Sequence, residues 1–82
     1  MHDLLLAKEM LEIAIDYAKK NKLASLTEIM IELGQIEDHA EDITSQNLKS
    51  VFNLIKTDTI ANKAKLKIKK VSGSHWKLIS IK

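Results

Sequence analysis

The spacing of apolar residues changes repeatedly along this chain, and that change is the strongest constraint on its fold. Apolar side chains recur with a helical period over residues 3–21 and again over 45–57. They alternate with polar side chains over residues 26–36, 64–69 and 76–81. The pattern therefore predicts the order helix, strand, helix, strand, strand. Because no linker divides the 82 residues, we expect a single domain over residues 1–82.

One face of each predicted element supplies the core. The apolar stripes of the two helices consist of Leu6, Ala7, Met10, Leu11, Ile13, Ala14, Tyr17 and Ala18, and of Leu48, Val51, Phe52 and Ile55. In the first strand, Ile29, Ile31 and Leu33 share one face. Gly34 is predicted to mark a bulge or the end of that strand. Asn21 is predicted to be the left-handed cap that ends the first helix.

Connection rules turn this order into a topology. The first strand, the second helix and the second strand form a βαβ unit, so these strands should be parallel with a right-handed crossover. The last two strands should pair as an antiparallel hairpin with its turn at residues 72–74. The prediction is an α+β two-layer sandwich, with two helices on one face of a three-stranded mixed sheet. Met30, Trp76 and Leu78 are then expected on the uncovered face.

The composition excludes several classes of function. The chain has no Cys, so disulfides, thiolate zinc sites and Cys nucleophiles are excluded. It has no Arg, a formal net charge of only +2, and one residue each of Trp, Tyr and Phe, which argues against nucleic-acid binding. No apolar run is long enough to span a membrane, and no signal peptide is recognisable, so we expect a cytoplasmic protein. Since no catalytic motif is present, we do not expect an enzyme.

The most specific chemical feature is His2, directly after Met1. The amine of Met1, the amide nitrogen of His2 and the imidazole of His2 can close fused chelate rings around one metal ion. Such a flat, nitrogen-rich set suits Ni(II) or Cu(II). The topology also predicts that the three histidines, His2, His39 and His75, lie at one end of the molecule. The alternative is that His2 is an arbitrary residue before a capped helix, and that His39 and His75 are solvated loop residues.

Several segments in the same order resemble the HypA/HybF family of nickel metallochaperones for [NiFe]-hydrogenase maturation. Residues 1–7, Met-His-Asp-Leu-Leu-Leu-Ala, are similar to the opening Met-His-Glu-Leu-Ser-x-Ala of that family. Residues 17–21 resemble the end of its first helix, and residues 31–36, Ile-Glu-Leu-Gly-Gln-Ile, resemble its Leu-Glu-Ile-Gly-Glu-Leu strand. Residues 59–68 are similar to its Thr-Ile-Ala-Glu-Gly-Ala-Glu-Leu-Glu-Ile stretch. The resemblance implies the same two-helix, three-stranded fold.

The resemblance also implies a set of nickel ligands. This chain departs from the pattern of the family in three ways. The family binds nickel through the N-terminal amine, the second-position His and the backbone nitrogens of residues 2 and 3, which here are Met1, His2 and Asp3. The family has Glu where this chain has Asp3. The four-Cys zinc ribbon of the family is missing from this sequence, so we expect no bound zinc. The chain is then expected to be either a natural core domain without the ribbon or a core designed to mimic one. The acidic loop over residues 37–43 is longer than usual. His39 and His75 are candidate auxiliary nickel ligands.

Two surface features bear on partners. Lys65, Lys67, Lys69 and Lys77 are predicted to line the uncovered sheet face. A solvated face paired with Glu28 and Glu32 is favoured over an acidic partner. On the same face, the apolar residues Met30, Trp76 and Leu78 predict a homodimer or a docked protein partner.

Two functions follow from these observations. One is a metallochaperone that binds nickel transiently and transfers it to a partner, which by resemblance is a nickel-handling GTPase or the hydrogenase large subunit. The other is a degenerate paralogue that serves as a protein–protein interaction or regulatory module without delivering metal. Retention of His2 favours the first function, whereas loss of the ribbon favours the second.

Overall fold

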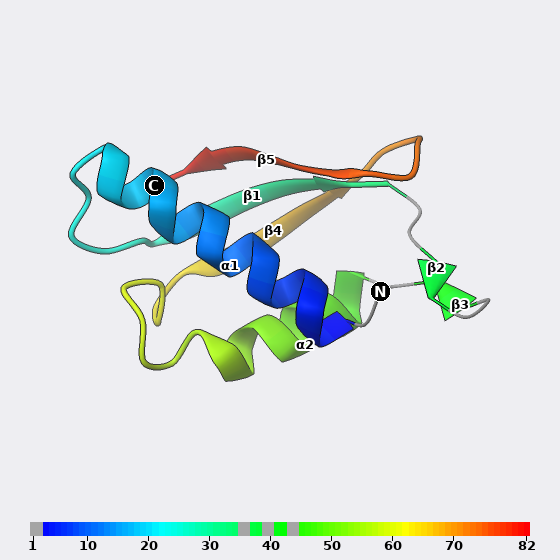
Figure 1. Ribbon diagram of the computed structural model, residues 1–82, viewed down its shortest axis with the longest axis horizontal. Coiled ribbons are helices and arrows are strands. Elements are labelled where there is room, and N and C mark those ends of the chain that lie inside the picture. Colours follow the sequence, from blue (N-terminus) through cyan, green and yellow to red (C-terminus); the bar gives the residue numbers. More distant parts are fainter. Residues whose placement is uncertain (1–2, 35–36, 39–40, 43–44) are drawn as a thin grey trace.

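The computed structural model describes residues 3–34, 37–38, 41–42 and 45–82. Its elements, drawn in Figure 1, are α1 (Asp3–Lys20), β1 (Glu28–Leu33), β2 (Glu37–Asp38), β3 (Glu41–Asp42), α2 (Ser45–Ile55), β4 (Lys65–Lys70) and β5 (Trp76–Ile81). The two helices and the three longer strands confirm the predicted order. The prediction of a loop over residues 37–43 is wrong in part, because β2 and β3 pair antiparallel as a two-residue ladder.

The three longer strands form one mixed sheet with the order β4-β1-β5. β1 is parallel to β4, as the βαβ unit predicts, and antiparallel to β5. The predicted hairpin is wrong, because β5 pairs with β1 instead of with its sequence neighbour β4. The physical reason lies in β1, whose inward residues Ile29, Ile31 and Leu33 are completely buried. A central position gives this strand a neighbour on each side, whereas hairpin pairing would leave it at an edge.

A bulge in β5 reverses the expected faces of two residues. The register runs from Met30 opposite Ser80 to Ile31 opposite Leu78, so Ile79 is an extra residue without a partner. Directly opposite residues of an antiparallel pair share a face. Leu78 therefore lies on the helix side of the sheet, and both it and Trp76 pack against the buried core. Their predicted place on the uncovered face is wrong, and with it the apolar cluster from which a homodimer through that face was predicted.

The core lies between the sheet and both helices. Its largest fully buried side chains come from both helices, from β1 and from the segment that leads into β1: Phe52, Leu6, Met10, Leu26, Ile29, Ile31, Leu33 and Leu48. The predicted stripe of α2 is confirmed. The stripe of α1 is narrower than predicted, because Ile13 and Tyr17 are 37% and 47% exposed at its margin.

The end of α1 is closed by a Schellman-type arrangement of hydrogen bonds. The amide of Leu23 donates to the carbonyl of Ala18 at 2.8 Å, and the amide of Lys22 donates to the carbonyl of Lys19 at 3.1 Å. The left-handed residue is Lys22, with φ of 59°, so the prediction of Asn21 was one residue early. Asn21 instead donates from its side-chain amide to the carbonyl of Tyr17 at 2.8 Å.

Candidate functional site

The segments that flank the predicted metal ligands lie at one end of the molecule. α1 and β1 run in opposite directions, so the first turn of α1 lies toward the same end as the carboxyl end of β1 (Figure 1). The 71–75 connection between β4 and β5 lies at that end too. Met1, His2 and His39 fall outside the described residues, so the expected meeting of the three histidines stays a prediction.

The carboxyl end of β1 is enclosed by the 71–75 connection. This connection must cross from one side of β1 to the other, because β4 and β5 flank that strand. The amide of Val71 donates to the carbonyl of Leu33 at 3.0 Å, and the amide of Gly34 donates to the carbonyl of His75 at 2.8 Å. The crossing is therefore held by backbone bonds on both sides of β1.

Two glycines allow the 71–75 connection to pass close to the end of β1. A Cβ atom at Gly34 would lie 2.5 Å from the carbonyl oxygen of Gly73 and 2.8 Å from that of His75. Gly73 has φ of 107°, which side-chain-bearing residues rarely adopt. Gly34 comes directly after β1, as predicted, but its reason is the close approach of a second backbone rather than a turn of its own.

His75 is the one histidine whose position the structure describes. Its side chain is exposed, and its backbone carbonyl accepts the Gly34 amide. Among the described residues, no group of three or more His, Cys, Asp and Glu side chains is arranged to hold a metal ion. The role of His75 as an auxiliary ligand stays a prediction.

The first turn of α1 offers backbone nitrogen atoms. The helix begins at Asp3, so the amide of this residue has no acceptor within the helix. A metal that displaced its proton would break no helical hydrogen bond. The next two residues, Leu4 and Leu5, are each 53% exposed.

An apolar groove begins at these two leucines, and the sequence analysis did not identify it. Its volume is about 470 Å³, and its lining consists of Leu4, Leu5, Lys8, Leu11, Glu12, Ile15, Ile55 and Thr59. The signal in the sequence is the run Leu4-Leu5-Leu6, because consecutive residues of a helix cannot all face one core. Only Leu6 of the three is buried.

Trp76 and Leu78 line a groove at the side of the sheet instead of the uncovered face on which they were expected. Together with Ile13, Tyr17 and Lys77 they border a groove of about 320 Å³ between α1 and β5. The ammonium of Lys20 lies 5.5 Å from the centre of the Tyr17 ring, within reach of a cation–π contact. Whether Trp76 and Leu78 contact a partner stays a prediction, now at the edge of the sheet.

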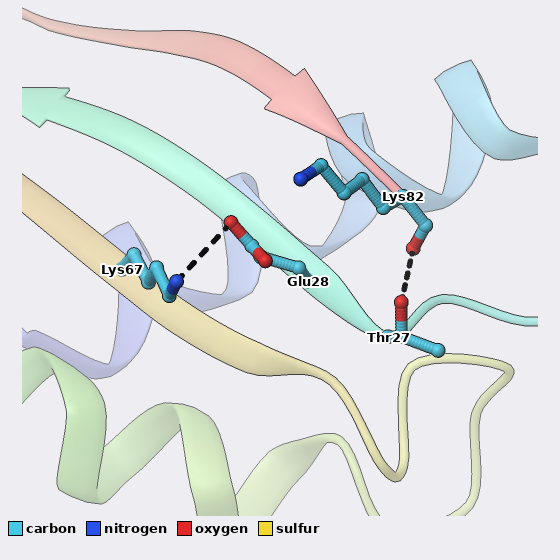
Figure 2. A network of polar contacts seen from close by, with 4 residues as sticks. All are labelled: Thr27, Glu28, Lys67 and Lys82. Atoms are coloured by element: carbon cyan, nitrogen blue, oxygen red, sulfur yellow. Dashed lines mark hydrogen bonds and ion pairs between the residues drawn. The ribbon is translucent and has the colours of Figure 1, made fainter.

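The uncovered face of the sheet is charged. Glu28 and Glu32 of β1 lie in register with Lys65 and Lys69 of β4, and Glu32 also faces Lys77 of β5. The ammonium of Lys67 lies 3.5 Å from the Glu28 carboxylate, as Figure 2 shows. This pair agrees with the favoured expectation of a solvated face with ion pairs across the strands.

The ends of β1 and β5 are joined beside this pair. The hydroxyl of Thr27 donates to the carbonyl of Lys82 at 3.2 Å (Figure 2). The amide of Lys82 in turn donates to the carbonyl of Glu28 at 2.9 Å. β5 is therefore held along its whole length against β1.

No helix within the described residues is long and apolar enough to cross a membrane.

Comparison with known proteins identifies related sequences and folds. The family model described as "Hydrogenase/urease nickel incorporation, metallochaperone, hypA" matches residues 1–76. A hydrogenase maturation factor HypA of Albidiferax ferrireducens is 28% identical over 76 residues, which are 93% of this chain. The chain spans 64% of the length of that relative.

A solved structure has the same fold. The solution structure of the Ni metallochaperone HypA from Helicobacter pylori aligns with a TM-score of 0.82, over 99% of this chain and 96% of that chain. The sequence identity of the pair is 13%, so this comparison supports the fold alone. It agrees with the predicted α+β sandwich of two helices and a three-stranded mixed sheet.

Proposed function

The chain belongs to the HypA family, and on that premise we propose that it binds Ni(II) as cargo and passes it to a partner protein in hydrogenase or urease maturation. The observation that carries the proposal is the family match, which begins at residue 1 and so includes the Met1-His2 start. Proteins of this family are metallochaperones and not enzymes. The chemistry proposed here is accordingly capture and release of a metal ion, without a chemical step.

The proposed nickel ligands are nitrogen atoms of the first three residues. They are the amine of Met1, the imidazole of His2 and the backbone nitrogens of His2 and Asp3. This set requires that Met1 carry a free amine. Nitrogen donors in a plane match the tetragonal preference of Ni(II). The proposal is supported by the start of α1 at Asp3, because the first-turn amides need no acceptor within the helix.

Charge also favours this ligand set. The N-terminus of a helix carries partial positive charge, which opposes a bare cation there. Two deprotonated backbone nitrogens cancel the double positive charge of Ni(II), so the bound complex adds no net charge to the end of α1. Binding must release protons from amide, imidazole and amine, so the affinity should rise with pH.

The partner and the compartment are part of the proposal. A nickel-handling GTPase or the hydrogenase large subunit would receive the metal in the cytoplasm. His39 and His75 would serve as auxiliary ligands during capture or transfer. Since the 82 residues contain no Cys, we expect them to bind no zinc through thiolates.

A nickel titration tests the proposal. The protein should begin at Met1, without an N-terminal tag, and its intact mass should confirm that Met1 is present and unmodified. Calorimetry should give one equivalent of bound nickel, and absorbance should show a square-planar band. Both signals should disappear in His2→Ala and in a variant with one Gly inserted before Met1. Lys63→Ala is the control, because it removes an exposed side chain and leaves all the proposed nickel ligands intact.

Each result of the titration separates the alternatives. Equal binding by all variants would refute the N-terminal site and move any metal to other histidines. Complete absence of nickel binding would favour the second function, a degenerate paralogue that acts as an interaction or regulatory module. The specific observation in favour of this second function is that the 82 residues contain no Cys, so they offer no thiolates for a zinc site.

A further inference from the structure

The free edge of β4 combines positive charge with unpaired backbone groups. Among the strands that the structure describes, only β1 pairs with β4, so β4 lies at the edge of the sheet. A groove of about 310 Å³ runs beside it, lined by Lys65, Leu66 and Lys67 of β4 and by Lys49 and Asn53 of α2. Three of these five residues are lysines, and none is acidic.

The backbone of β4 presents alternate residues to this free edge. The amide of Lys65 donates to Thr27, and the amide of Val71 donates to Leu33 of β1. Backbone groups alternate in direction along a strand. The even-numbered residues Leu66, Ile68 and Lys70 therefore direct their amides and carbonyls away from β1. No described residue forms a hydrogen bond with these outward groups.

Lysine side chains flank this edge on both sides. Lys65, Lys67 and Lys69 project onto the uncovered face, and Lys49 approaches from α2. Lys67 reaches the Glu28 carboxylate at 3.5 Å (Figure 2). Within the described residues, Lys49, Lys65 and Lys69 form no ion pair. Glu28 and Glu32 lie in register with Lys65 and Lys69 on this face, but the ammonium groups of these two lysines and of Lys49 remain available to an acidic partner.

We propose that the free edge of β4 docks an extended acidic peptide segment of a partner protein by strand addition. In this mode, backbone hydrogen bonds supply affinity, and alternate side chains supply specificity. Residues two apart along a strand are about 6.6 Å apart. Acidic residues at every second position of the added strand would therefore lie beside Lys65, Lys67 and Lys69. The proposal does not depend on nickel binding.

Other occupants fit the edge less well. A second copy of the chain would place lysines of one β4 against those of the other, and like charges on adjacent strands repel. Nucleic acid would need stacking or a planar guanidinium fork. The chain has no Arg, and its single Trp lies in β5 at the opposite edge of the sheet. The observations therefore favour a peptide.

The test uses a blocked peptide of alternating Glu and Val, added to the isotope-labelled full chain. We expect changes in the NMR shifts of the Leu66, Ile68 and Lys70 amides, and slower hydrogen exchange at these amides. Replacing Lys65 and Lys69 together by Gln should weaken binding about tenfold, whereas Lys8→Gln on α1 is the matched control and should not change it. A peptide in which Gln replaces every Glu should bind the unmodified protein even more weakly than the Glu-containing peptide binds the double Lys variant.

Three results would overturn the proposal. Equal binding of a peptide with a central Pro, which lacks a backbone donor and cannot continue a ladder, would exclude strand addition. Absence of binding, or binding unaffected by the double Lys variant, would exclude this edge. Tighter binding of single-stranded oligothymidylate at the same amides would show that the lysines of this edge bind nucleic acid rather than an acidic peptide. Because each measurement is made without nickel, failure here leaves the proposed metal site unaffected.

Discussion

Replacing Gly34 by Ala should destabilise the fold substantially, although the change adds a single methyl group. The new Cβ would lie 2.5 Å from the Gly73 oxygen, 2.8 Å from the Gly73 carbonyl carbon and 2.8 Å from the His75 oxygen. All three atoms belong to backbone, so no flexible side chain can move aside. Relief requires the 71–75 connection to shift away from β1.

The magnitude follows from what that shift disrupts. Overpacking costs about 1–3 kcal/mol, and weakening the Gly34–His75 and Val71–Leu33 hydrogen bonds adds about 1 kcal/mol each. Replacing Gly restricts the unfolded chain and returns about 0.4–1 kcal/mol. The free energy of unfolding should therefore fall by about 2–5 kcal/mol, which lowers Tm by roughly 10–40 °C for a domain of this size.

Urea unfolding followed by far-UV circular dichroism measures this loss. Hydrogen exchange of the residue 34 and Val71 amides should accelerate more than exchange in α2. Ser74→Ala is the control, because this residue is exposed and the variant should remain within about 0.5 kcal/mol of the parent. An Ala variant at position 34 as stable as the parent, with unchanged exchange, would refute the close crossing of the two backbones.

Three further predictions concern the core and the sheet. Phe52→Ala should lower the free energy of unfolding by about 3–5 kcal/mol, because the ring is fully buried. Leu54→Ala, at a residue that is 75% exposed, should change it by less than about 0.5 kcal/mol. Equal losses of the two variants in urea unfolding would contradict the orientation of α2. Trp76→Ala should lower the free energy of unfolding by about 1–3 kcal/mol, since the half-buried ring packs on the core. A negligible loss would indicate that the ring lies on the uncovered face instead. Glu28→Gln should cost less than about 1 kcal/mol, and less again at high salt, because the Lys67 partner is half exposed; a larger, salt-independent loss would show that this pair is more than a surface ion pair.

Local patterns were sufficient to predict most elements. The helical period of the first segment gives α1 to within one residue, and alternation places Ile29, Ile31 and Leu33 on the buried face of β1. These features depend on nearest neighbours in the chain and on the preference of apolar side chains for the interior. The same reasoning located the Met1-His2 start as the candidate metal site, which depends on chemistry within consecutive residues.

Long-range features could not be predicted in this way. The alternation of residues 76–81 assigned Trp76 and Leu78 to the wrong face, because a bulge at Ile79 shifts the register and no local signal marks it. The groove beside Leu4 and Leu5 also depends on how α1 lies against the end of α2.

The sequence by itself determined the identity of the elements, the residues that one face of each must bury, and the family to which the chain belongs. The tertiary structure alone decided that β5 lies beside β1 rather than β4. That choice depends on which arrangement gives the most deeply buried strand, β1, a paired neighbour at each edge, a comparison between distant segments. It also explains Gly34, since the connection to β5 passes the end of β1 so closely that a side chain at residue 34 would meet its backbone.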